Sequence, residues 1–293
     1  MWARHNRLFL GSISRPGLGS SIRQKVMILR TSFRSHTVLR QSLAGMALLA
    51  LLSVPAGVSA QESQPLTIEA DDSLEWNQTD GIYTATGNAI AIQGERKIAG
   101  NKLVATYDPD SEGRDIDEIT ATGAVTFVDT DIEAQGSKLI YTMKSDDYQV
   151  DGPDARVAGP RGTITADTRI ILDTRADKTQ EMKARGDALY RDADGRVFAG
   201  DSLDAIFDET GSLVTIDAKG DVRVVTEGGR EATSDAAIYN AVTEQAVLTG
   251  NVVVIDGESR MKGGRAEVDF KTGNSRMLSS GSGGRVSGVL VSN

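Results

Sequence analysis

Residues 246–254 read Ala-Val-Leu-Thr-Gly-Asn-Val-Val-Val, and this stretch decides the fold. Apolar side chains stand at every second position on both sides of Gly250, at 246, 248, 252 and 254. A period of two is that of a β-strand with one buried face. A glycine inside a strand usually marks a bulge, a bend or a close approach of another backbone. We therefore expect a strand that bends at Gly250.

The same setting recurs along the chain, so the body of the protein is predicted to be a repeat. The glycines that share it are spaced 36, 29, 34, 34 and 30 residues apart, with Pro153 treated as a one-residue insertion: Gly87, Gly123, Gly152, Gly186, Gly220 and Gly250. The residues two before and two after these glycines are mostly Ala, Val or Leu. Each glycine is therefore expected to mark a bent strand.

A second strand type alternates with the first and ends in a large apolar residue. These residues are Trp76, Tyr107, Met143, Leu172, Phe207, Tyr239 and Phe270. Turn sequences such as Asp-Glu-Thr-Gly at 208–211 follow them. Four positions earlier the pattern is mostly apolar, with Asp72, Thr168 and Asp235 as polar exceptions.

About seven strand–turn–strand units therefore fill residues 61–280, with neighbours stacked in order as in a solenoid. The fold is predicted to be all-β. The first and last strands, near Leu66–Ala70 and Arg265–Phe270, are expected to be open sheet edges. Residues 281–293 are expected to form a flexible tail, with a last strand at Val286–Val291 as the alternative.

The composition excludes several classes of site. Of 32 Lys and Arg residues, eight lie in residues 1–60, where there is no Asp or Glu; this leaves 24 basic and 41 acidic residues, a net charge of −17, in residues 61–293. A domain with this net negative charge binds nucleic acid poorly, because phosphate binding needs clustered Lys and Arg residues. Cys is absent from the chain and both His residues precede residue 60, so triads with His and thiolate or imidazole metal sites are excluded from the body.

The N-terminal segment has the three-part pattern of a secretory signal peptide. Basic residues precede a short apolar run that ends in Val58-Ser59-Ala60. We place cleavage after Ala60, with Met27 as a possible start, and expect the body to be exported. A retained membrane anchor is the alternative, although the apolar run is shorter than the roughly 20 residues of a spanning helix.

The remaining motifs carry little chemistry. Asp108–Gly113 resembles half of a calcium loop, but Ile119 stands where the last acidic ligand is required. No carboxylate pair lies in a recognisable cleft motif, and no phosphate-binding glycine loop is present. We expect no metal, no cofactor and no enzymatic activity.

The repeat resembles the OstA-like lipopolysaccharide-transport family, and within it the periplasmic bridge component. The residues that carry the resemblance are 83–89 and 246–254, with their continuations at 99–103 and 261–270. The resemblance covers about residues 64–280 and implies an open, V-shaped antiparallel β-jellyroll whose hydrophobic interior shelters the acyl chains of lipid A. Implied partners are lipopolysaccharide, inner- and outer-membrane transport components of the same fold, and a second copy joined head to tail. The chain is longer than the usual bridge component; the related domain of the outer-membrane translocon and the anchored inner-membrane partner are the alternatives within the family.

The inward residues near the bends are small, which leaves room for a groove or allows two sheets to pack closely. If it is a groove, twelve inward residues are expected to line it: Ala105, Phe127, Tyr141, Phe207, Ala218, Val222, Val224, Tyr239, Leu248, Val252, Val254 and Phe270. A secreted structural or adhesive β-solenoid with a packed interior and no lipid cargo is the main alternative. A polysaccharide-processing enzyme is a more distant one.

Overall fold

The computed structural model describes residues 64–279, 281 and 284–291, and within these residues it is all-β. No helix occurs in this part of the chain, and so none that could cross a membrane. The proposed signal peptide lies outside the described residues. The strands are β1 (Thr67–Glu69), β2 (Ser73–Asn77), β3 (Ile82–Gln93), β4 (Arg96–Tyr107), β5 (Ile116–Asp129), β6 (Ile132–Thr142), β7 (Asp147–Asp151), β8 (Ala155–Gly159), β9 (Gly162–Ala166), β10 (Arg169–Thr174), β11 (Gln180–Asp192), β12 (Val197–Phe207), β13 (Leu213–Val225), β14 (Glu231–Asn240), β15 (Gln245–Asp256), β16 (Ser259–Asp269), β17 (Ser275–Leu278) and β18 (Ser287–Val289).

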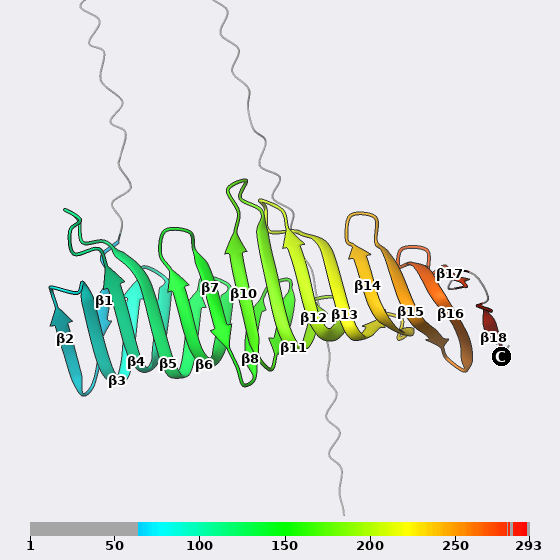
Figure 1. Cartoon of the computed structure of the whole chain (residues 1–293), viewed down its shortest axis with the longest axis horizontal. Helices are drawn as coiled ribbons and strands as arrows, with labels where there is room; N and C mark the ends of the chain where they lie inside the picture. Colours follow the sequence, from blue (N-terminus) through cyan, green and yellow to red (C-terminus); the bar gives the residue numbers. More distant parts are fainter. Residues whose placement is uncertain (1–63, 280, 282–283, 292–293) are drawn as a thin grey trace, which may run out of the picture. The chain divides into compact units, whose positions relative to one another are not determined.

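The strands follow one another along the sheet almost in chain order (Figure 1). Every pairing is antiparallel, and from β3 to β6 and from β11 to β16 each strand pairs with the next one in the sequence. Such nearest-neighbour contacts are those of a repeat architecture. The structure therefore confirms the predicted row of strand–turn–strand units.

The repeated glycines bend the long strands as predicted. Gly87, Gly123, Gly186, Gly220 and Gly250 have φ between +73° and +87°, and the residue after each also has a positive φ. The strand register shifts at every one of these pairs. A bulge of this kind kinks a strand, and glycine followed by Asn or Asp tolerates the left-handed conformation best. We call the line through these five glycines the fold line.

The fold line also explains the polar exceptions in the second strand type. A Cβ added to Gly87, Gly186 or Gly250 would meet Asp72, Thr168 or Asp235, respectively. Asp72 and Thr168 directly precede β2 and β10, and Asp235 lies in β14. These three polar residues therefore lie on the outside of the bend and not in the core. In two other units the residue opposite the repeat glycine is Asn101 or Asp201. Each stands six positions before the large apolar residue that ends its strand, whereas Asp72, Thr168 and Asp235 stand four positions before theirs. The outer halves of the strands thus differ in length by two residues.

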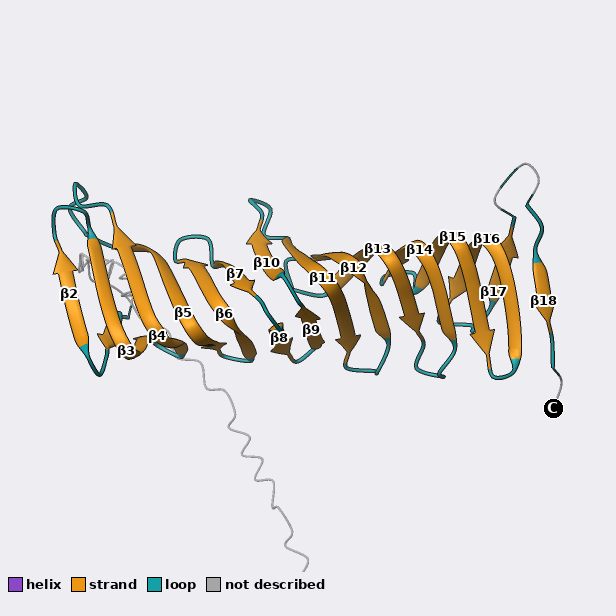
Figure 2. Cartoon of the chain, turned by 60° about the horizontal axis from the view of Figure 1, so that its bottom comes forward, coloured by secondary structure: helices purple, strands orange, loops and turns teal. Residues whose placement is uncertain are grey.

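The fold line divides the sheet into two half-sheets that face each other. Half-sheet 1 contains β2, β7, β10, β17 and the halves of the long strands that pair with them; half-sheet 2 contains β1, β8, β9, β18 and the other halves. The short strands β7 to β10, visible in Figure 2, continue both half-sheets through the middle of the row. The remaining repeat glycine, Gly152, lies between β7 and β8, so the strand is interrupted there instead of bending.

The edges of the sheet differ in part from the prediction. At the N-terminal end β1 and β2 each pair only with β3, so the edge expected near Leu66–Ala70 is present. The edge expected at Arg265–Phe270 is not, because β16 pairs with β15 on one side and with β17 and β18 on the other. The segment expected to be a tail contains β18, which corresponds to the alternative last strand.

Candidate functional site

The interior between the half-sheets contains all twelve residues predicted to face inward. Seven lie on half-sheet 1 and five on half-sheet 2, and the alternation of buried and exposed positions confirms the predicted register. Ten of the twelve are at most 3% exposed, while Phe207 and Phe270 are half-buried and pack against the core. The structure therefore brings the whole set together in one apolar interior.

Aromatic side chains from opposite half-sheets meet in this interior. Phe127 of half-sheet 2 lies 5.6 Å, centroid to centroid, from Tyr141 of half-sheet 1. Phe198, on half-sheet 2, lies 4.8 Å from Tyr239 and 6.2 Å from Phe270. Such tilted pairs add to the energy of burial itself. Phe198 is 1% exposed and was not among the predicted residues, although it stands at an inward position of its strand.

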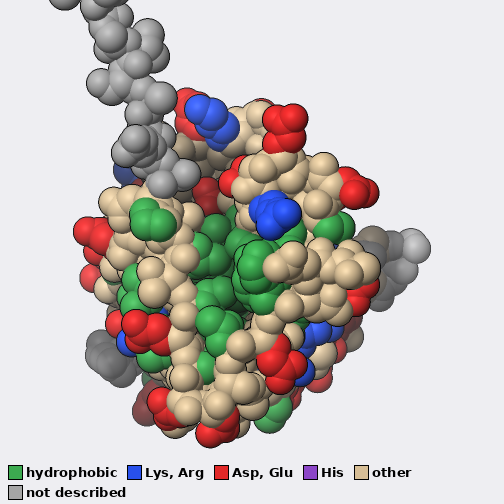
Figure 3. Space-filling view, turned by 90° about the vertical axis from the view of Figure 1, so that its left-hand side faces the viewer, with side chains coloured by type: hydrophobic (Ala, Val, Ile, Leu, Met, Phe, Trp, Pro, Cys, Tyr) green, Lys and Arg blue, Asp and Glu red, His purple; other side chains and the backbone are tan. Residues whose placement is uncertain are grey.

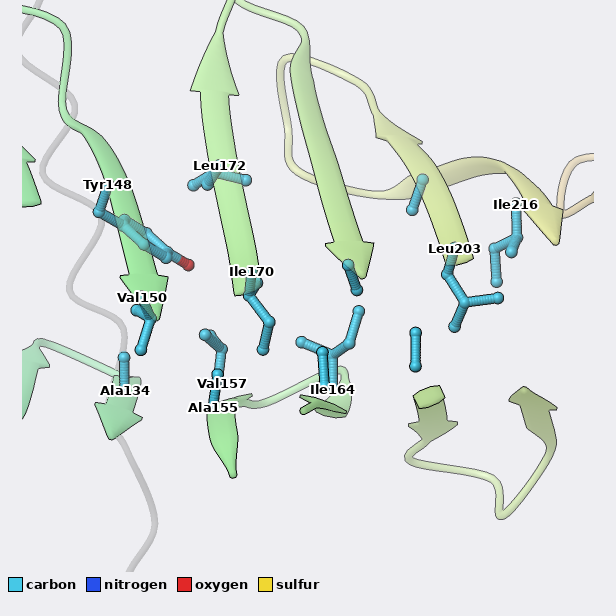
Figure 4. Packing of buried hydrophobic residues seen from close by; sticks show 14 of the residues in the cluster. Ala134, Tyr148, Val150, Ala155, Val157, Ile164, Ile170, Leu172, Leu203 and Ile216 are labelled. Carbon is cyan, nitrogen blue, oxygen red and sulfur yellow. The ribbon is translucent and has the colours of Figure 1, made fainter. Parts of the chain in front are cut away.

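The interior is packed in this conformation. Figure 4 shows Tyr148, Val150, Ile170 and Leu172 extending from one half-sheet toward Ala134, Ala155, Val157 and Ile164 on the other. Alanines near the fold line, such as Ala121 and Ala184, are fully buried. Small side chains at a bend let two sheets approach closely, so most of the expected groove is filled by the side chains that line it.

The side opposite the fold line, which we call the mouth, is tied shut by arginines that the apolar pattern did not reveal. Arg96, at the start of β4 in half-sheet 2, pairs with Asp129 (2.6 Å) and reaches Asp146 beyond half-sheet 1 (3.1 Å). Its guanidinium lies 4.7 Å from the centre of the Tyr141 ring. The hydrogen bond from Tyr141 ends on the same Asp146.

Two further arginines repeat this arrangement. Arg196 pairs with Asp192 and Asp194 and donates a 3.3 Å hydrogen bond to the Tyr239 hydroxyl across the mouth. Arg230 pairs with Asp256 (2.7 Å) and donates to the carbonyl of Gly273 on the opposite side. All three arginines follow a hairpin turn that contains glycine one or two positions before them, at 94, 195 and 229. That spacing is the signal by which the sequence could have revealed them.

Burial keeps three tyrosines of the interior neutral: Tyr141, Tyr148 and Tyr190. Burial raises the pKa of Tyr141 and of Tyr148, and for Tyr141 the hydrogen bond to Asp146 adds to the effect. Burial, followed by the charge of Asp192, raises the pKa of Tyr190 to about 12. A buried phenol with a raised pKa remains a neutral hydrogen-bond donor throughout the physiological range.

Apolar side chains are open to solvent at two places in particular. One is a pocket of about 430 Å³ in the middle of the row, between β7, β10 and the end of β12 on half-sheet 1 and β8, β9 and the end of β11 on half-sheet 2. Of the twelve predicted residues, Phe207 lines it. The other is the β2 end, where hydrophobic side chains gather in the centre of the face with charged side chains around them (Figure 3). Leu74 and Trp76 of β2 are 57% and 46% exposed there. The interior therefore presents apolar surface to solvent at its middle and at this end.

Two facing half-sheets, joined by bent strands around an apolar interior, define an open antiparallel β-jellyroll built from repeated strand pairs. The sequence profile of the family described as "LptA/(LptD N-terminal domain) LPS transport protein" matches this chain twice, over residues 67–178 and 163–274. The chain belongs to this family, as the resemblance predicted. The two successive matches overlap at residues 163–178 and together span residues 67–274.

Individual proteins are similar to parts of this chain. The LPS-assembly protein LptD of Sodalis glossinidius (strain morsitans) is 26% identical over 156 residues, which is 52% of this chain and 18% of that protein. The chain thus spans less than a fifth of that relative. Among solved structures, LptH of Pseudomonas aeruginosa, described as the LptA homologous periplasmic component of the conserved lipopolysaccharide transport device, is 13% identical. The match covers 78% of this chain and 96% of that one, with a TM-score of 0.20.

Proposed function

We propose that this chain binds lipopolysaccharide in the periplasm and carries it along the interior, with the acyl chains of lipid A between the two half-sheets. The single observation that carries the proposal is the apolar interior, which runs through every unit from β2 to β16 and includes all twelve predicted residues. Membership of the lipopolysaccharide-transport family supports the choice of cargo. No enzymatic step is proposed.

The energetic need for such an interior is large. Transfer of one CH₂ group from water to an apolar environment is worth about 0.8 kcal/mol. A lipid with six acyl chains of about 12 carbons each would expose apolar surface worth on the order of 60 kcal/mol in water. A protein that replaces water along the path removes this cost without a chemical step.

Because the interior is packed, cargo binding requires the half-sheets to part at the mouth. The fold line is suited to act as the hinge. The backbone hydrogen bonds between neighbouring strands continue on both sides of the bend, and the side chains at the bend are small. The ties at Arg96, Arg196 and Arg230 would have to break, and each includes a contact that a lipid phosphate could replace.

We further propose that the two ends of the sheet join other proteins of the same fold, or a second copy of this chain, in a bridge between the inner and outer membranes. An edge strand with unpaired backbone groups is a ready template for strand addition. β1 and β2 at one end and β17 and β18 at the other are such edges within the described residues.

A binding competition tests the proposed cargo. The purified chain is expected to bind labelled lipopolysaccharide, and unlabelled lipid A is expected to displace it, because the acyl chains supply the binding energy. Polysaccharide from which the acyl chains have been removed should not compete. Equal competition by the deacylated polysaccharide would contradict an acyl-chain site and favour a packed structural solenoid.

A further inference from the structure

The central pocket differs from the rest of the mouth in its wall. Tyr148, Leu172 and Phe207 from half-sheet 1 and Val157, Ile164 and Tyr190 from half-sheet 2 surround it. Four of these, Tyr148, Leu172, Val157 and Ile164, face one another across the gap in Figure 4. Its volume of about 430 Å³ lies within the range of small-molecule sites, and its wall is apolar and aromatic.

The hairpin between β8 and β9 leaves this part of the mouth open. It reads Gly159-Pro160-Arg161-Gly162, so glycine stands at both of its strand ends. In the hairpins that begin β4 and β12, the corresponding region carries Arg96 or Arg196, which ties the two half-sheets together. With glycine in these positions, the one long side chain of this hairpin, Arg161, reaches the opposite half-sheet only at its rim, where it meets the Thr210 carbonyl.

Arg161 lies at the rim of the pocket, and its cation has a neutral partner. Its Nη2 donates a 2.8 Å hydrogen bond to the carbonyl of Thr210, and its own carbonyl accepts a 3.1 Å bond from the Tyr190 hydroxyl. Within the described residues no carboxylate forms a salt bridge with it, whereas Arg96, Arg196 and Arg230 each have one. Two acidic residues of the adjacent β5–β6 turn, on the same half-sheet as Arg161, also line the pocket; Asp129 is paired with Arg96, and Asp131 remains.

An exposed cation beside an apolar pocket fits one kind of molecule. A phosphate binds an arginine through two parallel charge-assisted hydrogen bonds, which a neutral carbonyl cannot match. An acyl chain is the matching occupant of the apolar wall. An anionic amphiphile carries both groups, and a free phosphate or a neutral hydrocarbon carries one of them.

We propose that this pocket is a lateral entrance, at which one acyl chain of a phosphorylated lipid inserts between the half-sheets while its phosphate takes Arg161 from the Thr210 carbonyl. The proposal rests on the proposed function and specifies a place for it, midway along the sheet and not at either end. At this position the half-sheets are joined by the Arg161–Thr210 hydrogen bond, so the first separation of the half-sheets here requires no ion pair to break.

Three soluble probes distinguish the apolar wall of the pocket from Arg161: dodecyl phosphate, dodecyl maltoside and inorganic phosphate. Each is titrated into the full exported chain, the two amphiphiles below their micelle concentrations. Dodecyl phosphate is expected to bind tightest. Arg161→Glu should weaken its binding about tenfold or more, and Arg161→Gln by less, because one loses the guanidinium and adds repulsion while the other only loses the guanidinium. Dodecyl maltoside should be unaffected by either change.

Arg191→Glu is the matched control, since Arg191 is an exposed residue of the adjacent β11 with the same change of charge. It should bind dodecyl phosphate as the unaltered chain does, and urea midpoints of all variants check that each is folded. Equal losses in Arg161→Glu and Arg191→Glu would mean a general charge effect and would overturn the proposal, as would no loss in Arg161→Glu.

Lipid A distinguishes this proposal from the proposed function. If lipid A binds the unaltered chain and Arg161→Glu at the same rate and affinity, the lateral entrance is wrong while the lipid-carrying interior stands. If lipid A does not bind the unaltered chain at all, the proposed function and the entrance fail together. Slower lipid A binding in Arg161→Glu, with Arg191→Glu unchanged, supports the entrance.

Discussion

The substitution Gly220→Ala tests whether the fold line depends on glycine. Gly220 has φ +73°, a conformation that costs an L-residue about 1–2 kcal/mol. An added Cβ would also lie 2.8 Å from the Cβ of Asp201, which no side-chain rotation can move. Because the backbones of β12 and β13 must then separate, we add about 1–3 kcal/mol, the usual cost of overpacking. The expected total is about 2–5 kcal/mol of lost unfolding free energy.

A matched glycine isolates the second contribution. Gly229 lies in a turn with φ +80°, and a Cβ there would have no atom within 4 Å. Gly229→Ala should therefore cost only about 1–2 kcal/mol. In the Asp201→Gly background, where the opposing Cβ is absent, Gly220→Ala should fall to the same cost, which a double-mutant cycle measures.

Urea unfolding followed by circular dichroism gives these values, with the slope of the transition as a check on cooperativity. The reasoning would be refuted by a Gly220→Ala variant no less stable than Gly229→Ala. It would also fail if removal of the Asp201 side chain left the cost of Gly220→Ala unchanged, because the two residues would then not meet at the fold line.

Three further outcomes follow from the interior and the mouth. Phe198→Ala should lower the unfolding free energy by about 3–5 kcal/mol in urea titrations, because the ring is 1% exposed and packs on Tyr239 and Phe270; a loss below about 1 kcal/mol would mean that this part of the interior is not packed. The unfolding free energy should be highest below the ordinary tyrosine pKa of about 10 and fall as the pH rises toward 12. Burial raises the pKa of Tyr190 to about 12 and also raises that of Tyr148, so the folded state keeps protons that the unfolded state releases. An absorbance titration in which all tyrosines ionise near pH 10 in the folded protein would contradict this. Arg96→Ala should lower the unfolding free energy by about 1–2 kcal/mol and speed amide exchange at the adjoining ends of β5 and β6, as measured by hydrogen-exchange mass spectrometry. The control Arg260→Ala, at an exposed residue, should do neither. Identical exchange in the two variants would show that Arg96 does not hold the half-sheets together at the mouth.

The fold was predictable because the repeat expresses two strong local rules. Alternation at Ala246, Leu248, Val252 and Val254 specifies a strand with one buried face, and Gly250 followed by Asn251 supplies the two left-handed residues of a bulge. These rules act within a few residues, so they can be read without knowing what the strand packs against.

The polar exceptions could not be placed correctly from the pattern alone. Alignment on the large outer residue assumes that every outer half-strand has the same length, and the structure shows that Asp72 and Asp201 occupy the same place at different distances from it. The last edge was misplaced for a similar reason, since β17 is a four-residue strand after a turn and β18 carries no repeat glycine.

The state of the interior also lay beyond the sequence. Alanines such as Ala121 and Ala184 suit a slot and a close contact between sheets equally well, and only the distance between the half-sheets decides between them. The mouth was missed because the alignment followed apolar residues. Arg96 and Arg196 stand two residues before the buried Ile98 and Phe198 and so share their inward face, but these parts of β4 and β12 lay outside the aligned positions.

A photocrosslinking scan with lipopolysaccharide in the periplasm tests the central claim most directly. Crosslinking amino acids would replace three inward residues, Phe207, Val224 and Val254, and their outward neighbours Ile206, Val225 and Val253. The account predicts lipopolysaccharide adducts at the inward positions and none at the outward ones. Adducts at both sets alike, or none at the inward set in folded and exported protein, would contradict the claim that the interior carries the lipid.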